Sequence, residues 1–121
     1  MSRRVERVNS LLHREIAKII DRDVPLPEGV LVTVTRVETS PDLRQARAFV
    51  TVLAPGLDEK KILSRVKEHE SLIRSKVAPA ITFRFLPEIL ILEDKALIRE
   101  QKMRRLFAEV ESDSTLGPGP A

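Results

Sequence analysis

The pattern of apolar residues predicts that residues 3–21 form an amphipathic helix. At about 100° per residue, one face collects the aliphatic side chains Val5, Val8, Leu12, Ile16 and Ile19. The opposite face collects the cations Arg3, Arg7, Arg14 and Lys18. The helix is therefore expected to bury one side and to present a basic stripe on the other. The segment DRDVPLPEG at 21–29 ends the helix, because its prolines cannot continue it.

Two strands are predicted over residues 30–39 and 45–53, which are rich in Val, Thr and Ala and alternate in polarity. The turn Ser40-Pro41-Asp42-Leu43 joins them, and its proline presets the φ angle that such a turn requires. Because this connection is short, the two strands are expected to pair in antiparallel fashion. Phe49 is interpreted as a core residue, although alternation places it on the same face as Arg47, where it could stack a base.

The second half of the chain is predicted to contain a bent helix, a strand and a final helix. Residues 59–77 show a helical period that falters at His69-Glu70-Ser71, where a serine that bonds back to a carbonyl would favour a bend. Residues 81–92 are predicted to form a strand, and Pro87 indicates an edge strand, a bulge or the end of the strand. The final helix is predicted over residues 95–111. Its apolar residues are Leu97, Ile98, Met103, Leu106, Phe107 and Val110.

This order of elements predicts an α+β fold. A helix of about 19 residues links the second and third strands, which is long enough for a right-handed crossover between parallel neighbours. We therefore expect a domain of residues 1–94, with a three-stranded mixed sheet and helices packed on one face. A basic helix over residues 95–111 and a disordered Gly/Pro-rich tail over residues 112–121 are expected to follow.

Composition narrows the possible chemistry. The chain of 121 residues has no cysteine, which excludes disulfides, thiol catalysis and cysteine-ligated metals. Only 3% of the residues are aromatic, so the core is expected to be aliphatic. The apolar runs are too short to cross a membrane, and no apolar leader opens the chain, so we expect a soluble cytoplasmic protein that does not bind membranes.

No catalytic centre, metal site or cofactor is expected. The two histidines, His13 and His69, lie in different predicted helices, and His69 is interpreted as a partly buried structural residue. No glycine-rich phosphate loop is present. The acidic pairs Asp21/Asp23 and Glu93/Asp94 are better explained by turns and helix caps than by acid–base catalysis. The chain is therefore not expected to be an enzyme.

Charge is the remaining functional signal. The net charge is +3, but residues 106–121 contain three acids and no cation, so the first 105 residues carry +6. A basic body favours a polyanion such as nucleic acid, bound through phosphate and 2′-hydroxyl contacts that weaken with salt. The placement of other cations adds six candidate contact residues to the stripe on the first helix. These are Arg36, Arg44, Arg47, Arg74, Lys76 and Arg84.

Three stretches together resemble the ribosome-binding factor A family over about residues 3–98. They are RRVERVNSLLHREIAKII, VTVTRVETSPDLRQARAFVTVL and LIRSKVAPAITFRFLPEILILED. The resemblance implies a type II KH-like fold that lacks the Gly-x-x-Gly loop of ordinary KH domains. It also implies a second helix bent at an Ala-x-Gly kink, whose positions are occupied here by His69, Glu70 and Ser71.

The resemblance further implies a function. It implies a non-catalytic factor, associated with cold adaptation, that binds the immature 30S small ribosomal subunit and assists maturation and 5′ processing of 16S rRNA. The electropositive face of the family would fall here on Arg3, Arg4, Arg7, Arg14 and Lys18. A chain of this kind is expected to be a monomer when free.

Two other functions are compatible with the sequence. One is a protein-interaction module that docks a partner on the basic helix or on the sheet edge, and its binding would survive RNase treatment. The other is a small-molecule-binding α+β domain, which would need a pocket that no sequence feature marks.

Overall fold

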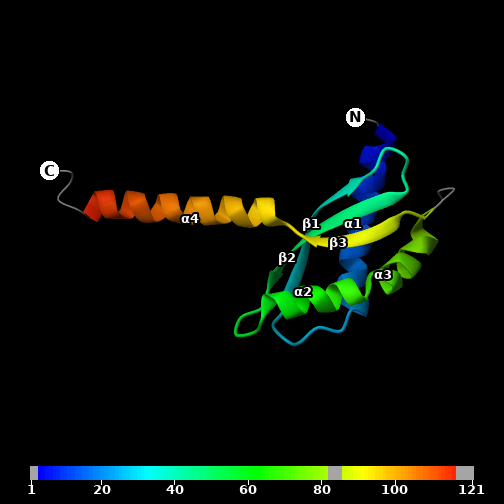
Figure 1. The fold of residues 1–121 in the computed structure, drawn as a ribbon, viewed down its shortest axis with the longest axis horizontal. Coiled ribbons are helices and arrows are strands. Elements are labelled where there is room, and N and C mark those ends of the chain that lie inside the picture. Colours follow the sequence, from blue (N-terminus) through cyan, green and yellow to red (C-terminus); the bar gives the residue numbers. More distant parts are fainter. Residues whose placement is uncertain (1–2, 82–85, 117–121) are drawn as a thin grey trace.

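The computed structural model describes residues 3–81 and 86–116 (Figure 1). The elements are α1 (Arg3–Asp23), β1 (Leu31–Thr39), β2 (Gln45–Leu53), α2 (Glu59–Glu68), α3 (Glu70–Val77), a 3₁₀ turn (Ala78–Ala80), β3 (Glu88–Glu93) and α4 (Lys95–Leu116). The predicted order of helices and strands is confirmed.

The sheet is mixed, as predicted. Its order is β1-β2-β3, with β1 antiparallel to β2 and β2 parallel to β3. The α2–α3 crossover between β2 and β3 makes the parallel pairing possible, because it carries the chain back to the other end of the sheet. The helices α1, α2 and α3 pack on one face of the sheet, and the opposite face is left open.

One aliphatic core lies between the helix layer and the sheet. Five residues of α1 are buried in it: Val8, Leu12, Ile16, Ile19 and Ile20. On the central strand β2, Ala46 and Ala48 are fully buried, and their short side chains leave room for the large aliphatic residues of α1. The periodicity of the first helix therefore identified its buried face correctly.

The crossover helix breaks at His69. His69 has φ −97° and ψ 12°, and its ring Nδ1–H donates to the carbonyl oxygen of Arg65 at 2.7 Å, which satisfies a group at the end of α2. The ring is half-buried and structural, as predicted. In the described part of the chain Ser71 makes no side-chain hydrogen bond, so the prediction that a serine assists the bend is wrong, because the histidine performs that role.

The third strand is shorter than predicted. It begins at Glu88, directly after Pro87, and forms an edge of the sheet. The earlier part of the predicted strand includes residues 82–85, which lie outside the described residues. Glu70 Oε2 accepts a hydrogen bond from the backbone N–H of Ile91 at 2.6 Å, so a helix side chain satisfies a group on this edge.

The final helix differs most from its prediction. α4 runs to Leu116 instead of ending at residue 111, so it includes the start of the segment predicted as a disordered tail. The rest of that segment, 117–121, lies outside the described residues. Met103, Leu106 and Phe107 are 47%, 52% and 60% exposed, because α4 projects away from the body of the domain (Figure 1). The proposed division of the chain at residue 94 stays a prediction.

Asp94 fixes the start of α4. Its carboxylate is buried, and Oδ1 accepts the N–H of Leu97 at 2.9 Å as a helix cap, which confirms the predicted cap role for this residue. Oδ2 accepts the hydroxyl of Thr35, which sits at a bulge in β1, and lies 3.6 Å from Nε of Arg36. Burial alone would raise the pKa of Asp94, but these hydrogen bonds and the arginine charge outweigh it, so the pKa is lowered.

We expect Asp94→Ala to lower the free energy of unfolding by about 2 kcal/mol at neutral pH, because the helix cap, the hydrogen bond from Thr35 and the ion pair with Arg36 are lost. The folded-state pKa lies below its unfolded value, so the carboxylate stabilises the fold above the unfolded pKa. That contribution is lost as the pH falls through the folded pKa, and the difference from wild type should therefore narrow in acid. Urea unfolding at neutral pH and at about pH 3 measures this narrowing.

The neighbouring half-buried residue provides the control for that experiment. The Glu93 side chain makes no hydrogen bond or ion pair within the described residues, so Glu93→Ala should change stability little at either pH. An Asp94→Ala effect of the same size at neutral and acidic pH would show that the carboxylate charge does not matter.

Candidate nucleic-acid interface

The basic stripe on α1 is held in a fixed orientation. The core residues bury one side of the helix, and two side chains on its flank bind the edge of β1. His13 Nε2–H donates to the carbonyl oxygen of Val34 at 2.7 Å, and Asn9 Oδ1 accepts the N–H of Thr39 at 2.9 Å. These contacts prevent α1 from rotating about its axis, so the side that faces away from the sheet stays exposed to solvent. Its exposed cations are Arg3, Arg4, Arg7, Arg14 and Lys18.

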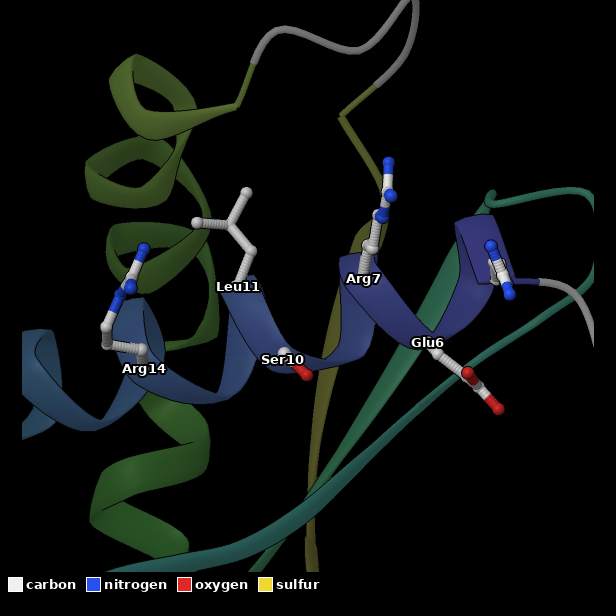
Figure 2. Close-up of a pocket in the computed structure, with 6 residues that line it drawn as sticks. Glu6, Arg7, Ser10, Leu11 and Arg14 are labelled. Carbon is white, nitrogen blue, oxygen red and sulfur yellow. The ribbon is translucent and has the colours of Figure 1, made fainter.

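The stripe borders an open hollow of about 540 Å³. Its lining residues are Arg3, Glu6, Arg7, Ser10, Leu11 and Arg14. Figure 2 shows Arg7, Leu11 and Arg14 projecting to the same side of α1, while Glu6 points the other way. A hollow formed by a single helix does not enclose a small molecule, but it can lie against an extended polyanion.

Few acids compensate the cations of this stripe. Glu15 lies 3.7 Å from Nε of Arg14 and 3.8 Å from Nζ of Lys18, and these are weak surface pairs. Arg7 has no ion-pair partner in the part of the chain that the structure describes. Arg7 can therefore bind a phosphate without first breaking an internal ion pair, and its guanidinium can do so with two parallel hydrogen bonds.

Two of the hairpin arginines, Arg36 and Arg47, are already engaged by protein groups. Glu38 accepts hydrogen bonds from Arg36 and from Arg47, the latter at 3.2 Å. The guanidinium of Arg36 also lies 3.9 Å from the ring centroid of Phe49. Phe49 is half-buried beneath Arg36 on the open face of the sheet, so its interpretation as a core residue is wrong. The strand alternation was the better guide to its position.

The remaining predicted cations are scattered. Arg44 is exposed beside the hairpin turn, and Lys76 is exposed near the end of α3. Arg74 donates to the carbonyl oxygens of Leu86 and Pro87 at 2.9 and 3.1 Å, so it fastens the segment before β3. Arg84 lies outside the described residues. The structure thus brings together the stripe on α1 and, separately, the pair Arg36 and Arg47 on the open sheet face.

The exposed cations of α2 were not predicted as site residues. Lys60, Lys61, Arg65 and Lys67 are all exposed. The i, i+4 spacing of Lys61 and Arg65 places them on one face of the helix, and this spacing was a signal in the sequence that could have identified them.

Within residues 3–81 and 86–116, no group of three or more His, Cys, Asp or Glu residues is arranged to hold a metal ion. None of the described helices combines the length and the apolar character needed to cross a membrane.

The order of elements, the mixed sheet and the broken crossover helix define a type II KH-like α+β protein with a basic helix on its surface. A sequence model of the ribosome-binding factor A family matches residues 4–107. The chain is 34% identical over 113 residues to ribosome-binding factor A from Macrococcus caseolyticus, covering 93% of this chain and 99% of that protein. The chain belongs to the ribosome-binding factor A family, as its hairpin and the segment before β3 indicated.

Solved structures agree with this fold. The crystal structure of ribosome-binding factor A from Thermus thermophilus superposes with a TM-score of 0.63 at 21% identity, over 74% of this chain and 94% of that chain. A homology model of the Thermus thermophilus factor, fitted into a cryo-EM map of its complex with the 30S subunit, gives a TM-score of 0.59 at 23% identity. That match covers 72% of this chain and 91% of the other. Both comparisons show the fold.

Proposed function

We propose that this chain is a non-catalytic assembly factor of the small ribosomal subunit. It binds the immature 30S subunit in the cytoplasm as a monomer and assists maturation and 5′ processing of 16S rRNA. One observation carries the proposal: the cations of α1 line a face whose orientation is fixed by the buried aliphatic side opposite. Membership of the family and the 30S complex of the Thermus thermophilus factor support the choice of partner.

The proposed contact is with the RNA backbone. Arg7 and Arg14 lie two helical turns apart on one side of α1, and each can neutralise a phosphate of the same RNA strand. Such contacts carry little sequence information, so the factor recognises the shape of the rRNA and not its bases. Binding holds an rRNA segment in place while the subunit matures. This role requires no proton transfer and no covalent step by a group on the protein.

Co-sedimentation with immature small subunits tests this proposal. We expect the wild-type chain to sediment with the subunits at moderate salt and to dissociate as salt rises, because released counterions drive binding. A failure of the chain to associate with the subunits at moderate salt would contradict the proposal. Binding to a partner that persists unchanged after RNase treatment would instead favour a protein-interaction module docked on α1.

A further inference from the structure

Another group of exposed cations lies away from α1. Lys60, Lys61 and Arg65 of α2 are exposed and form no ion pair within the described residues. They line an open groove on α2 with Ser64 and Glu68. Asp58 is the N-cap of α2, and its carboxylate accepts the N–H of Lys60 at 2.9 Å, so the first turn that carries these lysines is capped.

A cleft of about 360 Å³ lies beside this groove, between α2 and α4. It lies between the end of β2, the first turns of α2 and the basic half of α4, and none of its lining residues belongs to α1. The cleft is lined by Thr51, Val52, Leu53, Glu59, Lys60, Leu63, Glu93, Gln101, Lys102 and Arg105. Lys60 lines both the groove and the cleft, so the two hollows adjoin at this residue, and together they are called the path.

The charge of this path favours a polyanion. Lys60, Lys61, Arg65, Lys102 and Arg105 are its cations, and Glu59, Glu68 and Glu93 are its acids. None of these cations forms an ion pair in the described part of the chain, whereas Arg104, on a different side of α4, is paired with Glu100 at 2.8 Å. The cap at Asp94 stabilises the first turn of α4, the helix that forms one side of the cleft.

We propose that this path, the α2–α4 track, binds the phosphate backbone of a second RNA segment. It is defined by Lys60, Lys61, Arg65, Lys102 and Arg105. One molecule would then hold two segments of the same RNA, one along α1 and one along the track. The inference rests on the proposed function for the class of ligand, and it adds a site and a bridging role that the stripe on α1 does not supply.

Two charge-matched double variants of α4 test the track. Lys102→Glu with Arg105→Glu removes its cations, whereas Arg99→Glu with Arg104→Glu makes the same change in charge at exposed positions that do not line the cleft. We expect the first variant to bind immature small subunits about tenfold more weakly. Its plot of log affinity against log salt should become shallower by about 2, one for each lost phosphate contact. The second variant should lose less than about threefold.

A variant on α2 tests whether the loss of binding involves both helices of the track and not α4 alone. Lys60→Glu with Lys61→Glu should reproduce the loss, and thermal unfolding should show that all variants fold as the wild type does. Equal losses for the two α4 variants, or no loss with Lys60→Glu and Lys61→Glu, would overturn the track. A loss on subunits but not on naked 16S rRNA would also overturn it, because the partner would then be an acidic protein.

The outcomes separate this inference from the proposed function. If Arg7→Glu with Arg14→Glu abolishes binding while the track variants behave as the Arg99 and Arg104 control, only the track is wrong. If the wild-type chain does not bind small subunits at moderate salt, the proposed function is wrong, and the track is wrong with it.

Discussion

Reversing the charge of Arg7 and Arg14 together is expected to weaken binding to immature small subunits by about 100-fold at moderate salt. Each substitution removes a phosphate contact and places an acid against the RNA backbone. Both residues are exposed on α1, so their replacement should not disturb the core that holds the helix in place. The equilibrium dissociation constant, measured over a series of salt concentrations, tests the expectation.

The control for this variant is Arg99→Glu with Arg104→Glu on α4, which changes the net charge equally but lies outside both proposed sites. If it weakened binding as much as the α1 variant, the effect would come from overall charge. The stripe on α1 would then have no special role. A normal melting transition for each variant would confirm that both proteins are folded.

Truncating Ile16 is expected to have the largest effect on stability. Ile16 is fully buried at the centre of the α1 face that packs on the sheet. Ile16→Ala should lower the free energy of unfolding by about 3 to 4 kcal/mol, through lost burial and the cavity left behind. That is a large part of the stability of a typical small domain. Urea unfolding monitored by circular dichroism measures it.

Ser10→Ala is the matched control, because Ser10 lies on the exposed side of the same helix. It should change the free energy of unfolding by less than about 0.5 kcal/mol. A loss below about 1 kcal/mol for Ile16→Ala would mean that the α1 face is loosely packed. The fixed orientation of the basic stripe, on which the proposed function depends, would then lose its physical basis.

The features that follow from local patterns could be predicted from the sequence. The helical period over residues 3–21 identified both the buried face of α1 and its exposed cations. The short link at residues 40–43 required antiparallel pairing, and the long crossover allowed parallel pairing of β2 with β3. Each of these predictions depends only on residues close together in the sequence or on the length of a connection, and both can be read from the sequence alone.

The partners of individual arginines could not be predicted in the same way. Arg36 lies over Phe49 because β1 and β2 change register at Thr35, and a bulge has no signature in the alternation of residues. Arg74 donates to the carbonyl oxygens of Leu86 and Pro87, which lie beyond the end of α3 and outside the range of a helical period. Both residues carry the charge expected of RNA contacts, yet internal partners occupy them.

The final helix shows another limit of periodicity. Met103, Leu106 and Phe107 have the i, i+3, i+4 spacing of an apolar helix face, but the structure leaves all three exposed. The sequence pattern shows which side of a helix is apolar. Whether that side is buried depends on whether another element of the fold packs against it. α4 begins after Asp94 and projects away from the sheet, so the domain does not cover that face.

Crosslinking of the wild-type chain to the rRNA of immature small subunits, with the crosslinked residues mapped by mass spectrometry, tests the central claim most directly. The claim is that the exposed basic face of α1 is a contact with the RNA. We expect crosslinked residues on α1 around Arg7 and Arg14. Crosslinks confined to the open sheet face around Arg47 and Phe49, with none on α1, would contradict it.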